Sequence, residues 1–152
     1  MKLVFSLVIT LAVGAIAGYA TATSIGTWYA TLQKPSFNPP NWIFGPVWTL
    51  LYILMGIALY LIWKKPKSHG RDRALSFFFF QLFLNFCWSF IFFNYHLIAF
   101  AMVDIILLWV MMVITMLLFS MLSKTAAWLF VPYILWVTFA TVLNIAIYKL
   151  NA

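Results

Sequence analysis

Five uninterrupted apolar stretches constrain this chain of 152 residues more than any other feature. They are separated by a proline-rich loop, "KKPKSHGRDR", "NYH" and "SK", and cover about residues 3–25, 42–63, 75–93, 97–122 and 126–148. Each stretch approaches or exceeds the roughly 20 residues that a helix needs to cross the bilayer core. Because backbone polar groups in lipid must be satisfied within the chain, the pattern predicts an all-α membrane protein, one bundle of five transmembrane helices spanning 1–152.

The charge distribution supports this interpretation and predicts an orientation. Only 7% of the residues are charged, against about 25% in soluble domains. The net charge of +7 does not indicate a nucleic-acid partner, because five of the nine basic residues lie in the connector 64–73. The positive-inside rule places that connector, Lys2 and Lys124 in the cytoplasm. The N-terminus is then inside and the C-terminus outside.

The first stretch admits two interpretations. Lys2, the apolar run and the ending Ala20-Thr21-Ala22 are typical of a cleaved signal peptide. The run is longer than the roughly 7–15 apolar residues of such signals. Gly14 and Gly18 also provide the small-residue face by which membrane helices approach closely. We therefore favour a retained helix.

Asp104 is the only acidic residue within a predicted span. A carboxylate in the membrane costs several kcal/mol unless it is paired or neutral, which makes the residue a candidate for a functional site. A hydrogen bond between helices that holds the bundle together is an equally good explanation.

Three other predicted helices carry unusual residues at helical spacing. These are Trp48 and Tyr52 in the second, Gln81, Asn85, Trp88 and Ser89 in the third, and Trp136, Ala140 and Asn144 in the fifth. Aromatic stripes are more often packing than ligand sites, and tryptophans near the span ends fit an interfacial belt. At 1.5 Å per residue, however, Trp48, Asp104, Asn85 and Ala140 all lie about 10–14 Å below the outer surface. Such a cluster predicts a cavity between helices.

The segment 34–41 precedes the second helix and contains three prolines. Proline fixes φ and reduces conformational freedom, so the segment can hold one shape. We interpret it as a rigid lid above the predicted cavity.

These motifs resemble a known family. "WYATLQKPSFNPPNWIFGPVWTLLYILMGIALYLIW" is similar to the signature of the translocator protein family, also called TspO, tryptophan-rich sensory protein or peripheral-type benzodiazepine receptor. "LNFCWSFIFF", "AMVDIILL" and "VPYILWVTFATVLN" resemble its third, fourth and fifth helices in the same order. The resemblance covers nearly the whole chain.

The resemblance implies a five-helix bundle, usually a homodimer, that binds porphyrins and, in some members, sterols, benzodiazepines or isoquinoline carboxamides. It implies a pocket beneath the first loop with the ligand-binding residues Tyr29, Pro39, Trp48, Asn85, Trp88, Phe100, Asp104, Trp136 and Ala140. Phe100 stands where animal members have tryptophan, so the indole N–H is missing. Ile145 replaces the sterol-recognition tyrosine of animal members, which argues against tight sterol binding. With these departures the resemblance implies a bacterial member, and we expect a bacterial cytoplasmic membrane.

Three functions remain open at this stage. The preferred one is a receptor or carrier for porphyrin or another apolar molecule. The second is an enzyme that degrades porphyrin with light and oxygen, using Trp48 and Trp136. The third is a regulatory membrane scaffold. The sequence shows no conventional catalytic residues, metal-ligand cluster or cofactor motif. Both histidines, His69 and His96, lie in connectors. Cys87 is the single cysteine, so it has no disulfide partner within the chain.

Overall fold

The computed structural model describes all 152 residues and contains helices but no strand. The α-helices are α1 (Lys2–Ser24), α2 (Phe44–Trp63), α3 (His69–Ser89), α4 (Ile98–Ser120), α5 (Lys124–Leu129) and α6 (Val131–Asn151). Short 3₁₀ turns cover Tyr29–Thr31 and Asn41–Ile43, and a π-helical turn covers Phe90–Asn94. Five segments are long and apolar enough to cross a membrane, with α5 and α6 forming one of them. The predicted all-α bundle of five membrane helices is confirmed.

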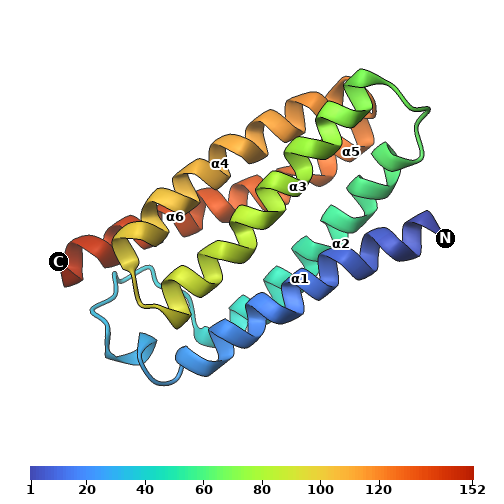
Figure 1. Cartoon of the computed structure of the whole chain (residues 1–152). Coiled ribbons are helices and arrows are strands. Elements are labelled where there is room, and N and C mark those ends of the chain that lie inside the picture. The colour runs from blue at the N-terminus through green and yellow to red at the C-terminus, as the bar shows by residue number, and fades with distance from the viewer.

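The helices run up and down along one long axis (Figure 1), with α1 beside α2, α3 beside α4, and α4 beside α6. The N-terminus and the connector between α2 and α3 lie at one end, which we call the connector end. The loop from α1 to α2, the turn from α3 to α4 and the C-terminus lie at the other, the loop end. Five crossings therefore place the two termini on opposite sides.

The helices depart most clearly from the predicted apolar stretches in two places. Helix α3 begins at His69, because the Ser68 hydroxyl accepts a hydrogen bond from the Arg71 amide at 3.1 Å. Asp72 in the first turn favours the helix start electrostatically. The last span is interrupted at Phe130, just before Pro132, whose ring nitrogen has no hydrogen to continue the helical pattern.

Helices α1 and α2 pack closely from the connector end to about Gly14. The Thr10 hydroxyl donates a hydrogen bond to the Tyr52 carbonyl at 2.8 Å. A Cβ atom at Gly14 would lie 2.5 Å from the Tyr52 ring, and one at Gly56 would lie 2.8 Å from Leu7 Cδ2. Glycine is required at both positions for this close approach.

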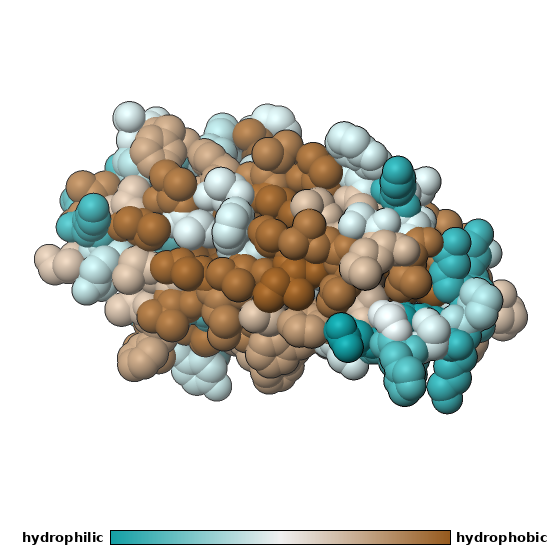
Figure 2. All heavy atoms as spheres, turned by 90° about the horizontal axis from the view of Figure 1, so that it is seen from above, coloured by the Kyte–Doolittle hydropathy of each residue, from teal (hydrophilic) through white to brown (hydrophobic).

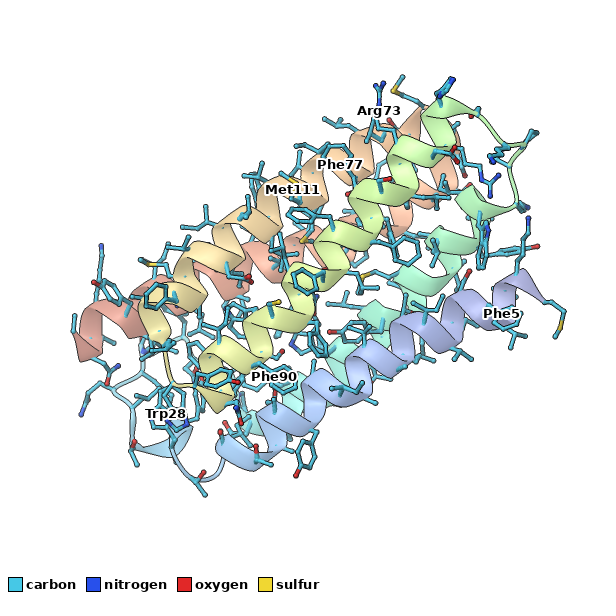
Figure 3. All side chains as sticks on the ribbon, in the orientation of Figure 1. Phe5, Trp28, Arg73, Phe77, Phe90 and Met111 are labelled. Carbon is cyan, nitrogen blue, oxygen red and sulfur yellow. The ribbon has the colours of Figure 1, made fainter.

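The surface between the two ends is apolar. Figure 2 shows a hydrophobic band along the molecule, with hydrophilic residues gathered towards its ends. Large apolar side chains such as Phe5, Phe83 and Leu117 are more than half exposed, and Figure 3 shows Phe5 projecting from α1. In water such a surface would aggregate, whereas lipid is its natural surrounding.

Candidate ligand-binding site

A cavity between the helices lies at the loop end. Helix α2 contributes Trp48, and α6 contributes Trp136 and Ala140. The full lining comprises Thr21, Tyr29, Phe44, Trp48, Trp88, Phe92, Phe93, Trp136, Phe139, Ala140, Leu143, Asn144 and Ile147. Eleven of these 13 residues are hydrophobic, as is usual for a site that takes an apolar small molecule.

The cavity wall formed by α2 and α6 is a set of aromatic rings in contact, two pairs of them edge to face. The Trp48 and Trp136 ring centroids are 6.5 Å apart with the ring planes at 89°. Phe44 meets Trp136 at 6.1 Å, and Trp48 lies 5.7 Å from Tyr52 below it. The rings therefore support one another and present both faces and edges to the cavity.

The opposite wall depends on the π-helical turn that ends α3. The Tyr95 amide donates to the Phe90 carbonyl at 2.9 Å, five residues back, so the turn is wider than an α-helical one. Phe92 and Phe93 are both buried and both line the cavity. Trp88 stacks on Phe92 with centroids 5.1 Å apart. The wider turn thus directs two consecutive aromatic rings inward.

The cavity has few polar groups, and one of them has no partner. Trp88 Nε1 donates to Asn144 Oδ1 at 3.0 Å, and Asn144 Nδ2 donates to the Ile98 carbonyl at 3.3 Å. The Trp136 Nε1 donor, by contrast, is buried and makes no hydrogen bond. A buried donor left without a partner costs about 1–3 kcal/mol, so an acceptor on a bound molecule would be stabilised there.

The loop between α1 and α2 closes the loop end of the cavity through Tyr29. The Tyr29 hydroxyl donates to Asn38 Oδ1 at 2.7 Å, and Lys34 Nζ lies 4.9 Å above the tyrosine ring. Lys34 also donates to the Tyr29 carbonyl at 2.9 Å. Burial raises the pKa of Tyr29 to about 12, although the Asn38 hydrogen bond opposes this shift. The hydroxyl is therefore protonated at neutral pH and remains a donor.

Two further contacts fasten this loop to the rest of the bundle. The backbone amide of Gln33 donates to Asn151 Oδ1 at 3.0 Å, while Asn151 Nδ2 donates to the backbone carbonyl of Gln33 at 2.8 Å. Trp28 stacks on His96 in the turn before α4, with centroids 4.1 Å apart, and Figure 3 shows Trp28 at this end of the molecule. The loop is thus fastened to both α6 and the α3–α4 turn.

A buried polar layer lies beneath the cavity. The Tyr52 hydroxyl donates to Asn85 Oδ1 at 2.5 Å, and Asn85 Nδ2 donates to the Tyr133 hydroxyl at 2.8 Å. The Tyr133 hydroxyl in turn donates to Gln81 Oε1 at 2.7 Å. Because every link is made, this chain joins α2, α3 and α6 at one fixed height.

Comparison with known sequences now identifies the family. The sequence model of the TspO/MBR family matches residues 6–150. The chain belongs to the TspO/MBR family. It is 46% identical to the tryptophan-rich protein TspO of Archaeoglobus fulgidus over 152 residues, which cover 100% of this chain and 98% of that protein.

Other relatives extend the likeness beyond archaea. The TspO of Chlorobaculum tepidum is 45% identical over 145 residues, which cover 93% of this chain and 90% of that protein. The human translocator protein is 39% identical over 126 residues, or 82% of this chain and 75% of that protein. The predicted family resemblance is confirmed.

In this TspO/MBR protein, the cavity lining includes five of the nine residues predicted to bind a ligand: Tyr29, Trp48, Trp88, Trp136 and Ala140. Asn85 lies in the polar layer below, and Pro39 lies in the loop above. Phe100 is 67% exposed on the outside of α4. Asp104 lines no part of the cavity and forms no interhelical hydrogen bond, and its Oδ2 atom is buried without a partner.

Several lining residues were absent from the sequence prediction. Phe139, Leu143 and Ile147 follow Trp136 and Ala140 along one face of α6, so helical spacing was a sufficient signal for them. Phe92 and Phe93 had no such signal, because regular α-helical geometry turns consecutive residues by about 100°.

The cavity is nearly filled by its own side chains. Its unfilled space is about 30 Å³, which holds about one water molecule. A second, larger hollow of about 510 Å³ lies between α1 and α2 and shares Thr21, Phe44 and Trp48 with the cavity. We call it the lateral groove, lined by Leu11, Gly14, Ala15, Ala17, Gly18, Thr21, Ala22, Ile25, Asn41, Phe44, Gly45, Trp48, Thr49, Tyr52 and Ser89.

Proposed function

We propose that this protein is a membrane receptor or carrier that binds protoporphyrin-like tetrapyrroles, and benzodiazepine- or isoquinoline-type molecules, in the aromatic cavity at the loop end. The observation that carries the proposal is the combination of a largely aromatic lining with the unpartnered Trp136 N–H. An apolar ring system supplies surface for the aromatics, and a polar atom on it satisfies the donor. Family membership supports the same ligand class.

The chemistry of a porphyrin fits this site in two respects. Its flat face can stack on Trp48 and Trp136, and each such contact is worth about 0.5–1.5 kcal/mol beyond area burial. Its carboxylates favour the loop end, where Lys34 supplies a cation beside the cavity residue Tyr29. The ligand would thus lie with its apolar part inward and its acidic edge towards the lid.

Titration of tryptophan fluorescence with protoporphyrin in nanodiscs tests the proposal. Trp136→Phe keeps a ring but removes the donor, so we expect an affinity loss of up to about tenfold, the value of one hydrogen bond. Trp128→Phe is the matched control, because Trp128 is 72% exposed and lies outside the cavity. Absence of saturable quenching in the wild type, or equal losses in both variants, would refute the proposal.

Light-driven porphyrin degradation is the second candidate function. Trp48 contacts both Trp136 and Tyr52, so oxidisable rings adjoin the cavity in a continuous chain. Illumination with oxygen distinguishes the two functions. If the protein is a receptor, the bound porphyrin bleaches no faster than porphyrin in detergent without protein. An enzyme accelerates bleaching to a defined product, and Trp48→Phe abolishes this while binding survives.

We further propose that the connector end faces the cytoplasm. The support is the charge asymmetry: seven of nine basic residues belong to Lys2, the connector 64–73 and Lys124. In a Cys87→Ser background, Ser36→Cys should react with an impermeant thiol reagent added to intact cells, while Ser68→Cys should not. The reverse labelling pattern would show that the connector end faces the outside.

A further inference from the structure

The aromatic cavity requires an entrance, because its unfilled space of about 30 Å³ is far below the roughly 300–1,000 Å³ of a typical ligand site. Some part of its wall must move before a ring system enters. The structure offers two candidate routes: past the loop between α1 and α2, or sideways from the lateral groove.

The loop route is held closed by many contacts. The Tyr29–Asn38 hydrogen bond, the paired Gln33–Asn151 hydrogen bonds and the stacking of Trp28 on His96 all resist its opening. The Ser24 hydroxyl also donates to the Phe93 carbonyl, which ties the end of α1 to the π-helical turn.

The lateral route has few such restraints at the loop end. Below it, α1 and α2 are in contact at Gly14 and Gly56. Towards the loop end, a Cβ atom built at Gly18 or at Gly45 meets nothing within 4 Å, and both glycines are exposed. The two helices therefore separate above Gly14, and the hollow of about 510 Å³ has the size of a ligand site.

The lateral groove also contains a nearly buried polar group. Ser89 lines the groove and is only 7% exposed, and its hydroxyl makes no capping hydrogen bond to the turn that follows. Serine in a membrane helix ordinarily bonds to its own backbone or to a neighbouring helix. A hydroxyl without that capping bond is available to a molecule within the groove.

We propose that the lateral groove is the entrance by which an apolar ring compound dissolved in the surrounding lipid reaches the aromatic cavity, with Trp48 as the gate. Trp48 lines both spaces, as Thr21 and Phe44 do, and its indole is the largest of these three side chains. Gly18, Gly45 and their small neighbours leave room for a flat ring, and the Ser89 hydroxyl binds a polar edge of it. This inference rests on the proposed function, since it concerns the same ligand.

A kinetic experiment tests the entrance separately from the site. Gly18→Phe adds a ring to the lining of the groove, and nothing lies within 4 Å of its Cβ. Gly26→Phe is the matched control, since Gly26 also has open space around it but does not line the groove. Gly45→Leu provides a second filling variant. Protoporphyrin is preloaded in donor vesicles, and its arrival is followed by quenching of tryptophan fluorescence in nanodiscs.

We expect Gly18→Phe and Gly45→Leu to slow association about tenfold or more with little change in affinity, because a blocked path slows entry and exit equally. Gly26→Phe should match the wild type. Asn151→Ala, which frees the loop, should not restore the rate in Gly18→Phe. Wild-type rates in both filling variants, or acceleration by Asn151→Ala alone, would overturn the lateral entrance while leaving the site intact. Absence of any quenching in the wild type would instead overturn the proposed function.

Discussion

The Tyr52 hydroxyl donates a hydrogen bond to Asn85 Oδ1 across 2.5 Å, and both side chains are almost completely buried, at 3% and 2% exposure. Trp48 rests on Tyr52, with centroids 5.7 Å apart. The height of the cavity floor is therefore set by a polar contact between α2 and α3. Apolar packing alone would leave the helices free to slide, because lipid and side chains are equally apolar.

Replacing Asn85 by leucine should destabilise the bundle. The change leaves the Tyr52 and Tyr133 hydroxyls without this partner at a buried position, at a cost of about 1–3 kcal/mol. Thermal unfolding in detergent measures the loss. Val103→Ala is the control, because Val103 is 62% exposed on α4 and contributes little to the core. Equal stability of Asn85→Leu and the control would show that the polar layer does not hold the helices together.

Gly14→Ala and Gly18→Ala should differ although both add one methyl group to α1. At Gly14 the new Cβ would lie 2.5 Å from the Tyr52 ring, and such overpacking costs about 1–3 kcal/mol. At Gly18 nothing lies within 4 Å, so stability should be unchanged. The unfolding midpoints of the two variants are compared with that of the wild type to measure each change in stability. A neutral Gly14→Ala would contradict the close packing of α1 on α2.

Asp104→Leu should leave the protein at least as stable as the wild type. The Asp104 carboxyl makes no hydrogen bond, and its Oδ2 atom is buried, so its removal relieves a desolvation cost of about 1–3 kcal/mol. Asp104→Asn keeps a polar group there and should gain less. The two variants are compared by thermal unfolding in detergent. A clear loss of stability in Asp104→Leu would reveal a partner for the carboxyl outside this chain.

Tyr29 should make the closed loop sensitive to alkaline pH. Its pKa is raised to about 12 by burial, above the ordinary value of 10.0. The stability that it contributes is thus fully present below pH 10 and is lost as the pH rises through about 12. The difference in unfolding temperature between the wild type and Tyr29→Phe should stay constant up to pH 10 and change above it. A difference that is constant up to pH 12 would contradict this assignment.

Apolar length alone is enough to predict the five membrane spans, because lipid allows a spanning segment few alternatives to a helix. Local signals outside the apolar stretches set the exact boundaries. Ser68 and Asp72 extend α3 beyond its apolar part, and Pro132 interrupts the last span. These are ordinary capping and proline effects that hydropathy does not detect.

Spacing along single helices predicts part of the candidate site, whereas Tyr29, which lies in a loop, was expected from the family resemblance alone. Trp48, Trp136 and Ala140 line the cavity as predicted, because depth and helical face are both readable from sequence. Asn85 and Asp104 line no part of the cavity: the Asn85 side chain belongs to the polar layer beneath it, and Asp104 is absent from its lining. Which groups meet between helices depends on how the helices pack against one another, and no single helix carries that information.

The π-helical turn Phe90–Asn94 gives α3 two angular registers. Below it, α3 follows α-helical spacing through Asn85 and the polar layer, whereas the wider turn accommodates one additional residue before the chain leaves for α4. Deletion of a single residue here would restore α-helical spacing and rotate the end of the helix by about 100°. The cavity wall can therefore be altered by insertion or deletion at this turn without disturbing the buried core beneath it.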